Sequence, residues 1–145
     1  MGKNNPLYEK YIKIKEYCEK IEELNIDCYK IFSPTTKEAI IEWETKNNVK
    51  LPEGYKNWLL LSNGLDVNHN GEIAGLEEIF KLEIPEYEGY YKIGSYIGDG
   101  SMLVIDKDGK FYKDDHCFGM EESSFEDFLE NWIIEHLRDE LLDNS

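Results

Sequence analysis

One loop carries residue types that could bind a metal ion. The stretch Asp66–Glu77 has oxygen-bearing side chains at its first, third and fifth positions, a glycine at the sixth and a glutamate at the twelfth. This spacing matches the calcium loop of an EF-hand. However, EF-hands normally occur in pairs, the sequence holds no second copy, and Asn63-Gly64 ends the preceding helix two residues before the loop. We therefore expect a turn-rich polar loop without a metal and keep a calcium-binding protein as the alternative function.

A second group of residues could carry acid–base chemistry. Asp115 and His116 are adjacent, and such a pair can move a proton. The sequence shows no nucleophile, cofactor loop or second catalytic group beside it, and the glycines at 94, 98 and 100 fit no phosphate-binding fingerprint. We predict that the protein is not an enzyme and needs no cofactor. Catalysis by Asp115 and His116 is a separate hypothesis.

The sequence before the Asp66–Glu77 loop predicts three helices, which would position that loop. Apolar residues at spacings of three and four predict an amphipathic helix from Leu7 to about Leu24. Thr35 and Glu38 form a capping box for a second helix. Pro52 favours the start of a third, Glu53–Ser62, which buries Tyr55 and Trp58 and ends at the following Asn-Gly pair.

The second half has the character of a sheet. The segment 73–84 fits either a strand or a short helix, whereas Tyr90–Ile97 is rich in residues that favour strands. Asp108-Gly109 between apolar runs predicts a hairpin that pairs residues 101–106 with 110–114.

The chain ends in an amphipathic helix. Its apolar stripe runs from Phe125 to Leu137, and Ser123 with Glu126 predicts the capping box at its start. The order of elements therefore predicts a single α+β domain over residues 1–145. In it, N-terminal helices and the C-terminal amphipathic helix pack on a mainly antiparallel sheet.

Charge restricts the class of partner. The 145 residues include 31 acidic and 16 basic side chains, a formal net charge of -15. Such a surface repels nucleic acid and anionic lipid, and it either keeps the protein soluble or attracts a basic protein. Three widely spaced cysteines form no zinc or disulfide pattern, and we see no signal peptide or membrane-length apolar run. We expect a cytoplasmic protein; its oligomeric state stays open.

Four stretches together resemble the SUKH superfamily. They are LPEGYKNWLLLSNG (51–64), IAGLEEI (73–79), the glycine- and aspartate-rich stretch 93–116 and SSFEDFLENWI (123–133). The resemblance implies an α+β binding module without catalytic activity. The family includes fungal regulators of cell-wall synthesis and bacterial immunity proteins that neutralise toxins, often nucleases.

The resemblance and the charge together predict the function. We expect an immunity protein that neutralises a basic toxin domain, such as a nuclease, through an acidic surface. Asp99 and Asp115 are the first candidates for contact because they are polar and lie at turns or strand ends. Glu72 and Asp66 in the polar loop complete the predicted partner-binding set.

Overall fold

The N-terminal helix forms as predicted. The computed structural model describes residues 4–24, 30–67, 71–96, 101–115 and 119–143. Helix α1 (Tyr8–Glu23) buries Ile14, Cys18 and Ile21, the stripe that the spacing indicated. No helix within the described ranges is both long and apolar enough to span a lipid bilayer.

Two shorter helices follow. Helix α2 (Lys37–Asn47) begins one residue later than the predicted capping box, because Thr36 rather than Thr35 is the last extended residue, and its Oγ1 accepts from the Ala39 amide at 3.1 Å. Helix α3 (Glu53–Leu59) is shorter than the predicted Glu53–Ser62. A tight turn replaces its last residues.

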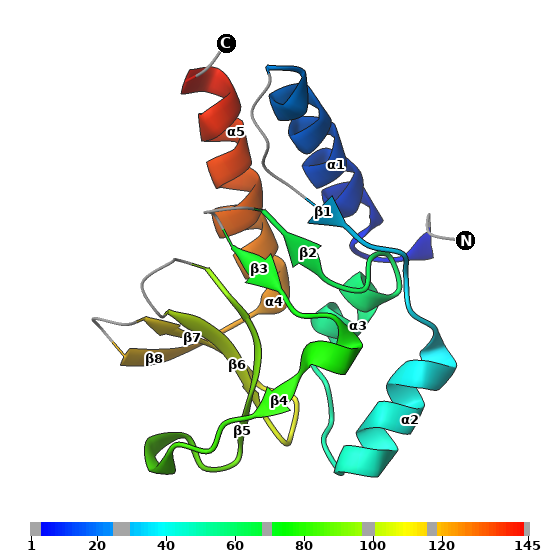
Figure 1. Cartoon of the computed structure of the whole chain (residues 1–145), viewed down its shortest axis with the longest axis vertical. Coiled ribbons are helices and arrows are strands. Elements are labelled where there is room, and N and C mark those ends of the chain that lie inside the picture. Colours follow the sequence, from blue (N-terminus) through cyan, green and yellow to red (C-terminus); the bar gives the residue numbers. More distant parts are fainter. Residues whose placement is uncertain (1–3, 25–29, 68–70, 97–100, 116–118, 144–145) are drawn as a thin grey trace.

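An eight-stranded antiparallel sheet forms the second layer (Figure 1). Its strands run in the order β1-β2-β3-β5-β6-β7-β8, and β4 pairs with β5. The bounds are β1 (Lys30–Ile31), β2 (Leu65–Asp66), β3 (Glu72–Ile73), β4 (Phe80–Lys81), β5 (Tyr90–Ser95), β6 (Met102–Asp106), β7 (Phe111–Asp115) and β8 (Gly119–Ser123). Two 3-10 turns, η3 (Leu76–Glu78) and η4 (Pro85–Tyr87), flank β4. The segment 73–84, which fitted either a strand or a short helix, thus contains both a 3-10 turn and a strand.

The central hairpin confirms the prediction made from Asp-Gly. Strands β6 and β7 pair with Ile105 opposite Phe111, and Gly109 in the turn has a φ of 89°. Strand β8 was not foreseen. It pairs with β7 over five positions and leads directly into the last helix, so Ser123 is a strand residue and Ser124 becomes the N-cap.

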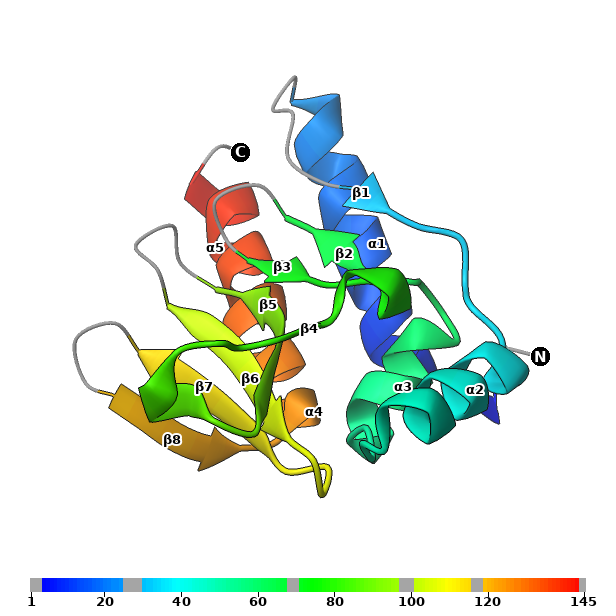
Figure 2. The ribbon, with the colours of Figure 1, turned by 60° about the horizontal axis from the view of Figure 1, so that its bottom comes forward.

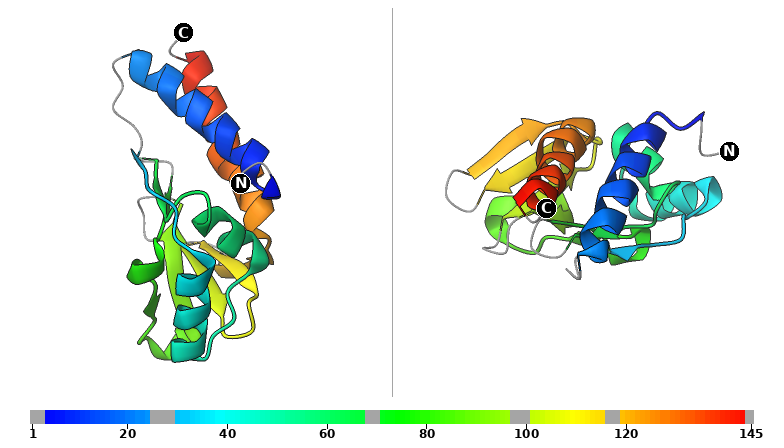
Figure 3. Two further views of the ribbon diagram at one scale, coloured as in Figure 1. Left: turned by 90° about the vertical axis from the view of Figure 1, so that its right-hand side faces the viewer. Right: turned by 90° about the horizontal axis from the view of Figure 1, so that it is seen from above.

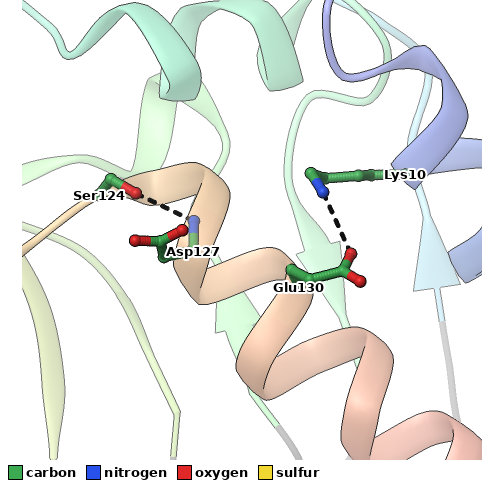
Figure 4. Close-up of polar contacts among 4 residues, drawn as sticks. All are labelled: Lys10, Ser124, Asp127 and Glu130. Atoms are coloured by element: carbon green, nitrogen blue, oxygen red, sulfur yellow. Dashed lines mark hydrogen bonds and ion pairs between the residues drawn. The ribbon is translucent and has the colours of Figure 1, made fainter.

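The C-terminal helix covers the sheet and lies beside α1. It comprises α4 (Phe125–Phe128), a π-helical turn η5 (Leu129–Ile134) and α5 (Glu135–Asp143). Figure 3 shows α1 and α5 side by side, extending beyond the sheet. Lys10 on α1 and Glu130 on η5 form an ion pair at 3.1 Å near the Ser124 cap, whose Oγ accepts from the Asp127 amide at 3.0 Å (Figure 4).

The main core lies between the sheet and these helices. Tyr55 and Trp58 of α3 are fully buried, as is Phe125 at 1% exposure, and all three belong to one apolar cluster that includes Leu103 and Ile105 of β6. Since side chains alternate along a strand, the residues between these core positions point to the opposite face. The α+β fold with helices at both ends of the chain is therefore confirmed.

Candidate functional site: the outer face of the sheet

The Asn63-Gly64 corner positions the first hairpin of the sheet. Asn63 Oδ1 accepts from the Leu76 amide at 2.8 Å, and its Nδ2 donates to Glu77 Oε2 at 2.9 Å. The Gly64 carbonyl accepts from Trp58 Nε1 at 3.1 Å. These bonds fasten the segment after β3 to the end of α3. The corner therefore has a structural role, and its polar atoms are already engaged within the chain.

The same corner explains why the stretches 51–64 and 73–79 occur together. Tyr55 Oη donates to the Ala74 carbonyl at 2.6 Å, and burial raises the pKa of this phenol well above its usual value. Gly64 has a φ of 116°, and a Cβ there would lie 3.0 Å from the Ile73 carbonyl oxygen. The two stretches therefore form one packed unit, in which Tyr55 and Gly64 have structural roles.

The calcium-like loop belongs to a β-hairpin. Asp66 in β2 and Glu72 in β3 are cross-strand partners, and the Val67 amide donates to the Gly71 carbonyl at 2.9 Å. An EF-hand instead places its loop between two helices. The flanking elements here are strands, and Glu77 lies in a 3-10 turn. The asparagines at 68 and 70 fall outside the described residues.

One row of side chains crosses the outer face of the sheet from edge to edge. Asp66, Glu72 and Asp114 are its carboxylates. Their positions follow from the strand register, since each residue in the row is the cross-strand partner of the next: Lys30, Asp66, Glu72, Ser95, Met102, Asp114 and Met120. Residues from seven separate strands thus meet on the face opposite the main core.

The structure brings two of the predicted contact residues together. Asp66 and Glu72 are both exposed and adjacent in the row. Asp115 ends β7 opposite Gly119, and its position in the strand places it on the other face from Asp114. Asp99 lies outside the described residues, as does His116 of the proposed acid–base pair. The grouping of the four predicted residues as one site therefore stays a prediction.

Sequence reasoning missed Asp114. This residue is 6% exposed, and its Oδ2 accepts a hydrogen bond of 2.5 Å from Tyr87 Oη. The bond to Asp114 raises the pKa of the Tyr87 phenol to about 12, with burial adding to the effect. Alternation along β7 could have assigned Asp114 to the outer face, but nothing in the sequence links it to Tyr87, 27 residues away.

A second tyrosine is held in the same way. Tyr112 Oη donates to Asp106 Oδ2 at 3.0 Å, and partial burial together with this bond raises the pKa of Tyr112 to about 12. The amides of Asp108 and Lys110 donate to the other oxygen of Asp106 at 2.9 and 3.0 Å. Both phenols therefore stay neutral near pH 7 and act as donors to carboxylates.

The segment around β4 folds over this face. Strand β4 pairs with β5 (Figure 2), and Tyr87 in the turn that follows β4 reaches Asp114 on β7. Leu82 and Val104 are buried at 6% and 0% exposure but lie outside the main core cluster, which shows that the outer face has a small apolar layer of its own. Lys92 places its Nζ 5.8 Å from the centre of the Phe80 ring.

A small cleft opens between β3 and β4. It has a volume of about 110 Å³ and is lined by Glu72, Glu78, Phe80, Lys92 and three small residues of the neighbouring strands. Within the described ranges, no three His, Cys, Asp or Glu side chains are placed to hold a metal ion. Two carboxylates and the Phe80 ring line the cleft, and the Lys92 ammonium beside that ring shows that a cation can be held there.

The fold defines an α+β module in which helices cover one face of an antiparallel sheet. A family model for the SMI1 / KNR4 family (SUKH-1) matches residues 34–131, more than half of the chain. The chain therefore belongs to this family, which confirms the predicted SUKH relationship. The matched region runs from just before α2 into η5 and includes every strand from β2 to β8. No curated protein matches the chain.

Proposed function

We propose that the protein is a non-enzymatic immunity protein that binds and neutralises a basic toxin domain, most simply a nuclease. The observation that carries the proposal is the formal charge of -15 in a member of the SUKH-1 family. A nuclease must present positive charge to bind phosphates, so its substrate-binding surface is complementary to an acidic protein.

The outer face supplies carboxylates in a fixed arrangement. The β2–β3 pairing holds Asp66 and Glu72 opposite each other, so both carboxylates lie on the same face of the sheet. Exposed carboxylates of this kind mainly accelerate the encounter with a basic partner. Asp99 and Asp115 complete the proposed contact set, with Asp115 at the end of β7 on the other face from Asp114, and we place the complex in the cytoplasm.

Co-purification with the toxin domain encoded beside this protein tests the proposal. We expect a complex at low salt whose affinity falls as ionic strength rises, together with loss of nuclease activity in the complex. Absence of a complex at low salt would refute the proposal. An acidic protein of similar size and charge serves as the control for non-specific attraction.

The calcium alternative has a separate test. Because strands rather than helices flank the Asp66–Glu77 loop, we expect no heat when calcium is titrated to about millimolar concentration in a calorimeter. A saturable exothermic or endothermic signal would support calcium binding instead. The Asp66→Asn variant would then lose that signal.

A further inference from the structure

Two large apolar side chains are exposed close together in sequence, at and just after β4. Phe80 is 53% exposed and Ile84 is 48% exposed, and only three residues separate them on the segment that crosses the sheet. Half-buried Tyr87, Tyr90 and Tyr112 lie on the same segment or on the strands beneath it. We call these five residues the outer aromatic patch. Exposed apolar and aromatic side chains gathered on one face are typical of protein interfaces.

The tyrosines of the outer aromatic patch are held in place. The rings of Tyr90 and Tyr112 pack edge to face with centroids 5.6 Å apart. Asp106 anchors the Tyr112 hydroxyl, and Asp114 anchors that of Tyr87. A partner that contacts these rings loses little conformational freedom in ordering them, so their burial contributes directly to affinity.

The rim of the outer aromatic patch is acidic. Glu83, Glu86 and Glu88 follow β4 and are all exposed, and Glu122 is exposed on the neighbouring strand β8. The Lys92 ammonium already lies over the Phe80 ring, which shows that this ring can contact a cation. An apolar centre surrounded by carboxylates is complementary to a partner surface with an apolar side chain among arginines and lysines.

We propose that the outer aromatic patch is the anchoring part of the interface with the basic toxin domain. This inference rests on the proposed function and adds a division of roles. The carboxylates of Asp66 and Glu72 set the association rate, whereas Phe80 and Ile84 are buried by the partner and set the dissociation rate. Aromatic and apolar anchors at the centre of an interface commonly carry most of its affinity.

Phe80→Ser and Ile84→Ser test the inference against matched controls. Ile41→Ser on α2 and Leu142→Ser on α5 remove apolar side chains that are somewhat more exposed, at 60% and 66%, and that lie on other elements. Kinetics of binding to the toxin domain are measured at low salt and at about 0.5 M salt, where steering is screened. Each patch variant should dissociate about tenfold faster or more at both salt concentrations, and the controls should match the wild type.

The outcomes separate the two proposals. Failure of the wild-type protein to bind the toxin domain overturns the proposed function and the inference together. Wild-type binding with unchanged dissociation of both patch variants overturns the inference alone. Equal acceleration in the patch variants and the controls also overturns it. Ile84 serves as the second position because its removal leaves the Phe80–Lys92 contact intact.

Discussion

Replacing Asn63 with alanine should destabilise the protein although the side chain is small and partly exposed. The amide of this residue links two segments that are distant in sequence. Its Oδ1 accepts from the Leu76 amide at 2.8 Å, and its Nδ2 donates to Glu77 Oε2 at 2.9 Å. Alanine keeps the backbone but removes both bonds.

The magnitude follows from the burial of the Leu76 amide. Leu76 is 4% exposed, so water reaches its unpaired N–H poorly after the substitution. Leaving such a donor unsatisfied costs about 1–3 kcal/mol, and the exposed bond to Glu77 contributes about 0.5 kcal/mol or less. We expect a loss of about 2 kcal/mol in the free energy of unfolding. For a domain of this size, that corresponds to a fall of roughly 4–8 °C in Tm.

Urea denaturation followed by tryptophan fluorescence measures the effect. The matched control is Asn47→Ala, because Asn47 Nδ2 donates to the Trp43 carbonyl at 2.9 Å within a single exposed helix end. That control should change stability by less than about 0.5 kcal/mol. Equal effects of the two substitutions would refute our view of the corner as the link between α3 and η3.

Asn63→Asp provides a second test of the same contact. An aspartate keeps an acceptor for the Leu76 amide but turns a carboxylate toward Glu77. The repulsion should lower stability at pH 7, and the loss should diminish as falling pH protonates the carboxylates. Stability of this variant relative to wild type is measured at pH 7 and at about pH 4. A difference that does not depend on pH would contradict the proposed proximity of the two carboxylates.

Three further predictions concern the sheet. Gly94→Ala should lower the free energy of unfolding by about 2–4 kcal/mol in urea denaturation, because a Cβ there would lie 2.2 Å from the Glu72 carbonyl oxygen. Tyr87→Phe should cost about 1–2 kcal/mol at pH 7 by removing the donor to Asp114. The folded-state pKa of Tyr87 is about 12, above the usual 10. The stability that the Tyr87 hydroxyl contributes is therefore complete below pH 10 and is lost as pH rises to about 12. Over that range, the Tyr87→Phe variant should lose less stability than the wild type. Combined Asp66→Asn and Glu72→Gln should slow association with the toxin domain several-fold at low salt, without changing dissociation in the same kinetic assay.

Each of these predictions has a matched control. Gly119→Ala adds a Cβ in open space at a φ of 87°, so backbone strain alone should cost about 1 kcal/mol. Tyr17→Phe removes a phenol on α1, away from the outer face, and should cost less stability at pH 7 than Tyr87→Phe. Glu19→Gln removes an exposed charge from α1 and should slow association less than the outer-face pair does. If a control changes the free energy of unfolding or the association rate as much as its test variant does, the corresponding prediction is contradicted.

Helical spacing and turn chemistry predicted most of the fold. Three of the patterns are local: the apolar stripe of α1, the Asp-Gly turn between β6 and β7, and the apolar face of the last helix. The structure confirms the element that each of them predicted. Both predicted capping boxes began one residue early, whereas the predicted start of α3 at Glu53 is confirmed. In each case an extended residue continues the preceding segment, and the serine or threonine next in sequence becomes the cap.

The short strands were not predictable in this way. Strands β1, β2 and β3 contain two residues each, which is too few for alternation to be visible. Tertiary contacts fix the β2–β3 hairpin, because Trp58 and Tyr55 of α3 donate hydrogen bonds to the Gly64 and Ala74 carbonyls on either side of it. The resemblance to an EF-hand loop arises in that hairpin, whose Asp and Asn residues are also those that favour turns.

The candidate site was even harder to locate from the sequence than the short strands. The stretches that identify the family, around Tyr55, Asn63 and Phe125, are buried or bonded internally, and they specify the fold. The outer face instead depends on pairs far apart in sequence, such as Tyr87 with Asp114 and Phe80 with Lys92. Family membership therefore explains how the sheet is built, whereas partner choice must be sought in the exposed residues that the sheet brings together. Substituting the outer face while retaining the Asn63-Gly64 corner should change partner binding and leave the fold intact.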